Sequence, residues 1–306
     1  MTSRKILYFI NPFSGPRRRS SLKDKITEKT LEQEIPFEIM FTNAAGEYPG
    51  LGDKIKEEGF TDVVICGGDG TVNQVSSCLL GIDVNVGILP CGSGNGLAFA
   101  AKIPKSTSRA LEVVFTGHPV FIDAFFINEK FSCMLCGLGF DAQVAHDFAE
   151  QPGRGLTTYV QQSIKNFIKA QPYQFDITHA GETFPAEAYF ISIANGNQFG
   201  NNFTIAPKAS LHDGLLDVIV VKKMSKARMI WAVLKQIRSG EVGDHRERNF
   251  HKKEVVYFQT DKLIIHNHQL APLHIDGDPA ETAKKFKIEV LPRAFKLIMP
   301  PSKPTL

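Results

Sequence analysis

The chain has 306 residues, of which 43% are hydrophobic and 22% are charged, so it is long and apolar enough to bury two cores. Its formal net charge of only +3 argues against a nucleic-acid partner but is compatible with work at an anionic membrane surface. No stretch reaches the roughly 18 consecutive apolar residues of a transmembrane helix, and the apolar run at residues 6–10 is too short for a signal peptide.

The first 120 residues alternate short apolar runs with helical stretches. The runs indicate buried strands, and the stretches between them carry apolar residues at helical spacing. This alternation predicts an α/β domain with a doubly wound parallel sheet, in which ligands gather at the carboxyl ends of the strands. The expected strands cover residues 5–10, 37–42, 63–66 and 86–90, and the expected helices include residues 22–26, 54–58, 71–79 and 97–101.

Three polar loops that contain glycine follow these strands, at residues 11–15, 67–73 and 91–96. In the second loop, the glycines let backbone N–H groups approach a phosphate at the start of a helix that Thr71 can cap. Asp69 would repel a bare phosphate, so its presence indicates a divalent cation between the two charges. One such loop could equally be an ordinary tight turn with a solvated Asp69, but three on one rim favour a cleft for a Mg-nucleotide.

From about residue 117, strand-like runs follow one another, mostly without helices between them. This pattern predicts a mainly antiparallel β-sandwich or a partly closed barrel. We therefore expect an α/β nucleotide-binding domain over residues 1–120 and a β-rich substrate domain over residues 121–291, with the chain end at 292–306 able to return to the first domain. The expected strands cover residues 120–127, 131–138, 173–178, 188–194, 216–221, 255–260, 263–265 and 286–291, and helices interrupt them at residues 156–169 and 226–238.

Two basic segments could meet an anionic surface. The helix expected at residues 226–238 is apolar on one side and basic elsewhere, a pattern that suits either a lipid surface or packing against the β domain. Arg17, Arg18 and Arg19 follow the first loop and could attract phosphate or an anionic headgroup, although charged residues that open a helix are commonly just solvated.

The five cysteines are odd in number and have no regular spacing, which favours free thiols in a reducing cytoplasm. Cys133 and Cys136 have the spacing of a redox or zinc pair, but they lie in an apolar run without a second pair. We expect both to be core residues.

Five sequence blocks carry a resemblance to a known family. They are Asn11-Pro12-Phe13-Ser14-Gly15, Gly67-Gly68-Asp69-Gly70-Thr71-Val72-Asn73, Leu89-Pro90-Cys91-Gly92-Ser93-Gly94-Asn95-Gly96-Leu97-Ala98, His212-Asp213-Gly214-Leu215-Leu216-Asp217 and Asp276-Gly277-Asp278. In this order and approximate spacing, the chain resembles the diacylglycerol kinase catalytic-domain family of lipid kinases over nearly its whole length. The third block is more similar to the sphingosine-kinase branch than to the bacterial diacylglycerol kinases. The second block alone would be weak evidence, since NAD kinases share it.

The resemblance implies phosphorylation of a lipid hydroxyl by ATP with Mg²⁺, and a lipid substrate that enters over the β domain at a membrane surface. Asp69 matches the aspartate that is essential for handling Mg-ATP in the family. The nucleotide contacts that the resemblance implies are Asn11, Pro12, Phe13, Ser14, Gly15, Thr42, Gly67, Gly68, Asp69, Gly70, Thr71, Val72, Asn73 and Ser93.

The resemblance also implies a structural magnesium in the Asp-Gly-Leu loop. Its ligands here would be the side chain of Asp213 and the backbone carbonyls of Ser210 and Leu215. Oxygen ligands suit such a hard cation, although a simple Asp-Gly turn between strands has the same sequence signature.

The phosphate acceptor needs a general base, because a lipid alcohol is a poor nucleophile. The family places a glutamate two residues after the aspartate of the last block, and this chain has Asp278 there. We assign Asp278 as the base. The missing methylene moves the carboxylate by about an ångström, which could cost on the order of a hundredfold in rate unless the loop compensates.

Two further positions bear on the branch of the family. Gly96 stands where many bacterial diacylglycerol kinases have an aspartate, so metal handling depends more on Asp69. Asp141 aligns loosely with an aspartate that binds the amino group of sphingoid bases, and a carboxylate facing an ammonium group is physically favourable. A helix cap after Gly139 is an equally good interpretation of Asp141.

The sequence therefore predicts a cytoplasmic, peripherally membrane-associated kinase of diacylglycerol, a sphingoid base or a related lipid. Two alternatives stay open. One is a kinase of a soluble metabolite of the NAD type, and the other is a non-catalytic module that binds nucleotide or lipid, since Asp278 and Gly96 depart from the family pattern. A homodimer also stays open.

Overall fold

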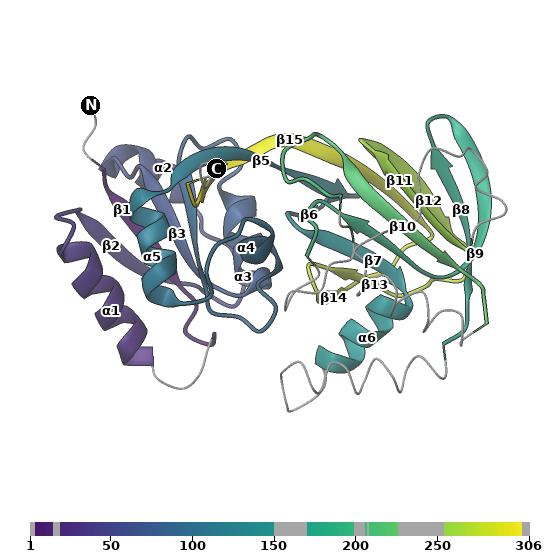
Figure 1. The fold of residues 1–306 in the computed structure, drawn as a ribbon, viewed down its shortest axis with the longest axis horizontal. Helices are drawn as coiled ribbons and strands as arrows, with labels where there is room; N and C mark the ends of the chain where they lie inside the picture. Colours follow the sequence, from purple (N-terminus) through teal and green to yellow (C-terminus); the bar gives the residue numbers. More distant parts are fainter. Residues whose placement is uncertain are drawn as a thin grey trace, which may run out of the picture. The chain divides into compact units, whose positions relative to one another are not determined.

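The computed structural model describes residues 4–14, 19–149, 170–198, 206, 208–225 and 254–301. These residues form two compact units (Figure 1). Unit 1 comprises Met1–Asp123 and Arg293–Leu306, and unit 2 comprises Ala124–Pro292. The helices expected at 156–169 and 226–238, together with Gly15, Arg17 and Arg18, lie outside the described residues.

Unit 1 contains a parallel sheet in the order β2-β1-β3-β4, and the end of β15 continues it beside β4 through Lys296 and Leu297. Every residue of β1 and β3 is buried, as expected for central parallel strands covered on both faces. The strands of this sheet are β1 (Ile6–Ile10), β2 (Phe37–Phe41), β3 (Asp62–Gly67), β4 (Asn85–Pro90) and β15 (Lys285–Met299).

Helices cover this sheet, as predicted for a doubly wound fold. In Figure 1, α1 and α5 lie in front of the strands, where they contact each other. The sequence prediction missed α5, although its apolar positions are buried. The helices of unit 1 are α1 (Arg19–Leu31), α2 (Leu51–Glu58), α3 (Asp69–Cys78), α4 (Gly96–Ala100) and α5 (Thr107–Thr116).

The start of α3 differs from the prediction. Thr71 was expected to cap this helix, but the N-cap is Gly68, in an extended conformation, and the helix begins at Asp69. The N-cap therefore lies three residues before the predicted one, and its extended backbone is the usual conformation of that position. Thr71 is therefore buried within the first turn, where its hydroxyl binds Asn11 instead of a helix amide.

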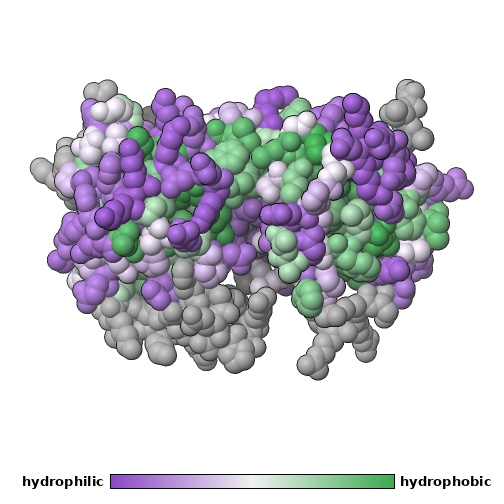
Figure 2. Space-filling model, turned by 180° about the vertical axis from the view of Figure 1, so that it is seen from behind, coloured by the Kyte–Doolittle hydropathy of each residue, from purple (hydrophilic) through white to green (hydrophobic). Residues whose placement is uncertain are grey.

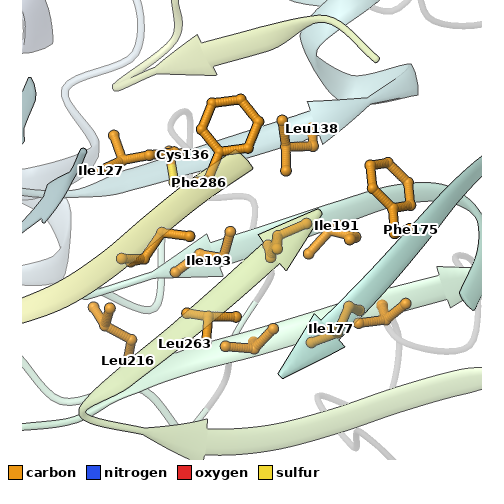
Figure 3. Packing of buried hydrophobic residues seen from close by; sticks show 14 of the residues in the cluster. Ile127, Cys136, Leu138, Phe175, Ile177, Ile191, Ile193, Leu216, Leu263 and Phe286 are labelled. Atoms are coloured by element: carbon orange, nitrogen blue, oxygen red, sulfur yellow. The ribbon is translucent and has the colours of Figure 1, made fainter. Parts of the chain in front are cut away.

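Unit 2 is a β-sandwich built from antiparallel strands. Its long strand β9 pairs with β8 along its first half and lies between β7 and β10 along its second half. This change of partners lets the strands enclose one core (Figure 3), in which Phe175, Ile191 and Phe286 are buried. The elements of unit 2, some shared with unit 1, are β5 (His118–Ile127), β6 (Lys130–Ser132), β7 (Leu135–Gly139), α6 (Phe140–Ala149), β8 (Tyr173–His179), β9 (Glu182–Ala194), β10 (Leu216–Lys222), β11 (Val255–Thr260), β12 (Lys262–Asn267), β13 (Leu273–Ile275), β14 (Asp278–Ala280) and the first part of β15.

The single strand predicted at residues 131–138 is split in the structure. β6 ends at Ser132 and β7 begins at Leu135. The backbone N–H groups of residues 133–135 bind the carboxylate of Asp276 instead of a neighbouring strand. Cys133 and Cys136 are buried free thiols, as expected for core residues.

Large hydrophobic side chains are exposed at a few described positions. Figure 2 shows hydrophilic side chains over much of the face that it draws, with hydrophobic areas between them. Phe13 is 81% exposed and follows β1, and Phe41 is 56% exposed and is the last residue of β2. The two strands are neighbours, and Ile10 pairs with Phe41. Across the described part of the chain, we find no helix with both the length and the apolar character needed to cross a bilayer.

Candidate active site

The loops that follow β1, β3 and β4 lie side by side at the carboxyl end of the sheet in unit 1. The backbone N–H of Asn11 donates to the carbonyl of Cys66 at 3.0 Å, and that of Cys91 donates to the carbonyl of Gly67 at 2.9 Å. Parallel strands bring their carboxyl ends to one edge. The structure therefore joins the three glycine-containing loops, which we call the rim (residues 11–14, 67–73 and 91–96).

Two glycines of the rim touch backbone to backbone. A Cβ atom on Gly92 would lie 2.5 Å from the Cα atom of Gly68, so no side chain fits there. The conformation of Gly92 is fixed by Asn95, whose side chain accepts its N–H at 2.8 Å and donates to its carbonyl at 2.7 Å. Asn95 is buried and has a left-handed φ of 56°, which asparagine tolerates better than most residues. Asn95 was not predicted as a site residue, although asparagine after glycine is a recognisable turn signal.

The amino terminus of α3 opens onto the rim. Its N-cap, Gly68, provides no side-chain hydrogen bond, and the first amides of any helix lack intrahelical acceptors. These N–H groups and the helix dipole together favour an anion. The carboxylate of Asp69 lies over the third loop, because a Cβ atom on Gly94 would be 2.7 Å from Asp69 Oδ2.

A side-chain bond joins the first and second loops. Asn11 Nδ2 donates to Thr71 Oγ1 at 2.7 Å, and Asn11 Oδ1 accepts the backbone N–H of Phe13 at 2.8 Å. Thr42 follows β2, and its N–H donates to the carbonyl of Ile10 at 3.0 Å. The predicted nucleotide residues in the described part of the chain thus lie on or beside one edge of the sheet. Thr71 and Val72 are partial exceptions, because their side chains are buried.

The Asp276-Gly277-Asp278 block forms the turn of the β13–β14 hairpin in unit 2. Asp276 and Gly277 both have positive φ, 50° and 87°, as a two-residue hairpin turn requires. The buried carboxylate of Asp276 accepts a hydrogen bond from Ser132 Oγ at 2.7 Å and one from the N–H of Leu135 at 2.8 Å. Asp276 therefore anchors the turn, while Asp278, the predicted base, is exposed at the first residue of β14.

Asp141, the predicted substrate-binding residue, is the second residue of the helix α6 and is buried. Its Oδ2 atom lies 3.5 Å from His274 Nε2, and its Oδ1 atom accepts the N–H of Ala142 at 2.9 Å. His274 lies on β13, two residues before Asp276. The sequence analysis did not select it, because an isolated histidine in a short apolar run has no distinguishing pattern.

The predicted magnesium ligands Ser210, Asp213 and Leu215 lie in one loop before β10. The carboxylate of Asp213 is exposed and accepts the N–H of Leu215 at 3.1 Å, which is the geometry of an Asx turn. Within the described ranges, no three His, Cys, Asp or Glu side chains are placed to hold a metal ion. One carboxylate with carbonyl oxygens and waters suits Mg²⁺, which keeps several waters, so the loop fits the proposed ion.

Asp217 lies at the start of β10, close to this loop, and its side chain is buried. Burial raises the pKa of its carboxyl to about 7, the hydrogen bond from Gln259 lowers it, and the nearby charge of Asp213 raises it. Asp217 is therefore a buried acid that titrates near neutral pH.

A cavity of about 290 Å³ in unit 1 lies beside Arg4, Asp62 and Asn85. These residues stand at the amino ends of β1, β3 and β4, which is the edge opposite the rim. The Arg4 guanidinium already binds Asp62 at 2.9 Å and the carbonyl of Phe115 at 2.9 Å. We therefore regard this cavity as part of the structural network that ties the chain start to α5.

Comparisons with known proteins match both parts of the chain. Residues 5–127 match the family model of the diacylglycerol kinase catalytic domain, and residues 135–299 match that of the YegS C-terminal NAD kinase beta sandwich-like domain. The chain is 31% identical over 254 residues to "Probable lipid kinase YegS-like" from Shewanella frigidimarina. The aligned residues cover 80% of this chain and 78% of that protein. It is 26% identical over 283 residues to "Probable lipid kinase YegS" from Salmonella typhimurium, with 90% of each chain covered.

Solved structures show the same fold. A structure from Bacillus anthracis str. Sterne covers 99% of each chain with a TM-score of 0.79 at 20% sequence identity. Another from the same strain, described as a diacylglycerol kinase, gives a TM-score of 0.73 at 18% identity, again with 99% of each chain covered. The predicted α/β domain followed by a β-sandwich is thereby confirmed.

Proposed function

Because the chain belongs to the diacylglycerol kinase catalytic-domain family and is a lipid kinase, we propose that it transfers the γ-phosphate of Mg-ATP to the hydroxyl of a lipid at a membrane surface. The observation that carries this proposal is the rim. There the amino terminus of α3, the close contact of Gly68 with Gly92 and the Asp69 carboxylate lie together. The relatives matched above are named lipid kinases, which does not favour the NAD-type alternative.

The rim supplies the groups that a nucleotide phosphate needs. Backbone N–H groups at the start of α3 donate to phosphate oxygens without side-chain rearrangement. The carboxylate of Asp69 would hold Mg²⁺, and the bound ion would neutralise the charge of the phosphates. Asn11 keeps the first loop in place through its bond to Thr71. The rim therefore suits a nucleoside triphosphate better than an uncharged ligand.

The hairpin turn of unit 2 supplies the base. Asp278 is an exposed carboxylate on a turn whose backbone is anchored by the buried Asp276. In the proposed step, the lipid oxygen attacks the γ-phosphorus, its proton passes to the Asp278 carboxylate, and the bond from phosphorus to the bridging oxygen of ADP breaks. A turn anchored in this way restricts the directions that the shorter aspartate side chain can take.

The Asp213 loop is proposed as the structural magnesium site. Asp213 presents an exposed carboxylate, and the carbonyl oxygens of Ser210 and Leu215 belong to the same loop. The bound ion would fix the loop that leads into β10. Its removal would then weaken unit 2 without removing any group of the rim.

Transfer of labelled phosphate tests the proposed function. Mixed micelles of diacylglycerol, monoacylglycerol, phosphatidylglycerol, sphingoid bases, ceramide and polyprenol are incubated with γ-labelled Mg-ATP and with wild type, Asp69→Asn or Asp278→Asn. We expect a labelled lipid with wild type, and losses of at least about a hundredfold in both variants, because each removes a charge used in the transition state.

Matched controls are Glu57→Gln in unit 1 and Glu281→Gln in unit 2, since both remove an exposed carboxylate outside the rim and the turn. Label in NAD without label in any lipid would instead identify a metabolite kinase. Binding of Mg-ATP without label in either would identify a non-catalytic module.

A further inference from the structure

A buried histidine and a buried aspartate lie next to the turn that carries Asp278. His274 is 0% exposed and Asp141 is 7% exposed, and His274 Nε2 lies 3.5 Å from Asp141 Oδ2. His274 belongs to β13 and Asp141 to the first turn of α6. Burying two such groups is unfavourable unless they interact, and the mechanism above uses neither.

The opposite strand is shaped to admit this pair. His274 faces Gly137 of β7 in the antiparallel register. A Cβ atom on Gly137 would overlap Asp141 Oδ2 and would lie 2.5 Å from His274 Nε2. Only glycine at this position leaves room for the carboxylate and the imidazole to meet over the strand.

The other nitrogen of the ring determines the tautomer. The backbone N–H of Gly277 donates to His274 Nδ1 at 3.3 Å, so Nδ1 acts as an acceptor and carries no proton. In a neutral imidazole the proton is then on Nε2, the nitrogen that faces Asp141. The carboxylate thus favours the tautomer that accepts the Gly277 amide.

The turn is therefore held from two sides. The Asp276 carboxylate binds the backbone of residues 133–135, and His274 binds the amide of Gly277. Both turn residues have left-handed φ values, which an Asp-Gly pair adopts readily in a two-residue hairpin turn, and the two bonds hold that turn in one arrangement. Asp278 follows immediately, so its direction depends on these two anchors.

We infer that His274, oriented by Asp141, is a positioning residue that fixes the 276–278 turn and so directs the carboxylate of Asp278. This inference rests on the proposed lipid-kinase function. It assigns Asp141 to His274, whereas the sequence analysis considered an amino group of a sphingoid base. Asp141 Oδ2 cannot contact both the His274 ring and a substrate amino group to the same extent. The two assignments therefore predict different effects of substitution.

Two substitutions of His274 separate the roles of its nitrogens. In His274→Asn the amide oxygen can replace Nδ1 and accept the Gly277 N–H, but nothing reaches Asp141. In His274→Gln the amide nitrogen can replace Nε2, but the Gly277 N–H loses its acceptor. In His274→Gln, we expect kcat to be about tenfold or more below that of wild type, with an unchanged KM for ATP. In His274→Asn, we expect kcat to lie within about threefold of wild type.

Folding is controlled by thermal unfolding and near-UV circular dichroism, with kcat expressed per folded enzyme. A purely structural role predicts that kcat follows the folded fraction in both variants, which would overturn the inference. Asp141→Asn adds a third arm, because it removes the charge that faces Nε2 at 3.5 Å and keeps a side chain of nearly the same size. A raised KM for sphingoid bases alone, with unchanged kcat on other lipids, would assign Asp141 to the substrate and would also contradict the inference.

A spectroscopic measurement on wild type requires no lipid substrate. In ¹⁵N-histidine-labelled protein at pH 7.5, long-range ¹H–¹⁵N spectra report the tautomer, and the His274 signals are identified by their loss in His274→Asn. We expect the Nε2–H form. In uniformly ¹⁵N-labelled protein, we expect the Gly277 amide shift to change more in His274→Gln than in His274→Asn. An Nδ1–H or doubly protonated ring would overturn the inference. If the tautomer is as expected but no lipid is labelled, the proposed function fails while the anchoring of the turn stands.

Discussion

The rim of unit 1 and the hairpin turn of unit 2 are made rigid in different ways. In the rim, backbone atoms approach closely, since Gly68 and Gly92 touch directly, and loop side chains such as Asn11 join the loops. The turn relies on buried polar side chains, because Asp276 and His274 bind backbone amides. Added atoms should therefore damage the rim, whereas the loss of an acceptor should damage the turn.

The largest expected effect on stability is at Asp276. Asp276→Asn replaces the carboxylate that accepts the Ser132 hydroxyl and the amides of residues 133–135. An amide nitrogen placed against these donors leaves buried groups unsatisfied, so we expect the free energy of unfolding to fall by about 3 kcal/mol. Urea denaturation followed by fluorescence measures it. Asp261→Asn, in an exposed turn of the same unit, is the control. An equal loss of unfolding free energy in both variants would show that the bonds of Asp276 do not stabilise the turn.

A smaller effect is expected for an added methyl group in the rim. In Gly92→Ala the new Cβ atom would lie 2.5 Å from the Cα atom of Gly68, and two backbone segments cannot move apart as easily as a side chain. We expect a loss of about 1–3 kcal/mol in stability and a Kd for Mg-ATP at least about tenfold higher by isothermal titration calorimetry. Gly52→Ala in α2 is the control, because its Cβ atom meets only the side chain of Ile82, at 3.3 Å. Unchanged ATP affinity in Gly92→Ala would remove Gly92 from the nucleotide site.

The smallest effect concerns pH and Asp217. Its pKa is raised to about 7 by burial, above the value of about 4 in an unfolded chain. The folded state therefore keeps a proton that the unfolded state releases, and stability falls as the pH rises from about 4 to about 7. We expect the stability of Asp217→Asn relative to wild type to increase as the pH rises from about 5 to about 8, in urea denaturation with a chelator present. A difference that does not depend on pH would show that Asp217 does not titrate in this range.

The sequence predicted the parts of the fold that depend on local pattern. The apolar runs and glycine loops of unit 1 predicted the strands β1 to β4 and the alternation of strands with helices. The predicted cap at Thr71 was wrong: α3 begins at Asp69, and the Thr71 hydroxyl is bound by Asn11, sixty residues away in the sequence. The strand expected at 131–138 was wrong because Asp276, more than a hundred residues away, binds the amides that would have continued it.

The residues of the candidate site also differ in whether local sequence pattern could reveal them. Contiguous motifs identified Asp69, Asp278 and the loops of the rim. The supporting residues Asn95 and His274 were not recognisable, because their importance depends on bonds to Gly92 and Gly277 that sequence spacing does not reveal. The roles of the predicted site residues stay predictions that the experiments above can test.

The most direct test of the whole account compares ATP binding with phosphate transfer in the same two variants. Calorimetry measures the Kd of Mg-ATP, and incorporation of label into lipid micelles measures transfer, for wild type, Asp69→Asn and Asp278→Asn. We expect Asp69→Asn to weaken both, whereas Asp278→Asn should leave the Kd within about twofold and lower transfer at least about a hundredfold. Transfer that survives Asp278→Asn, or ATP binding that is lost with it, would contradict the division between a nucleotide rim and a catalytic turn.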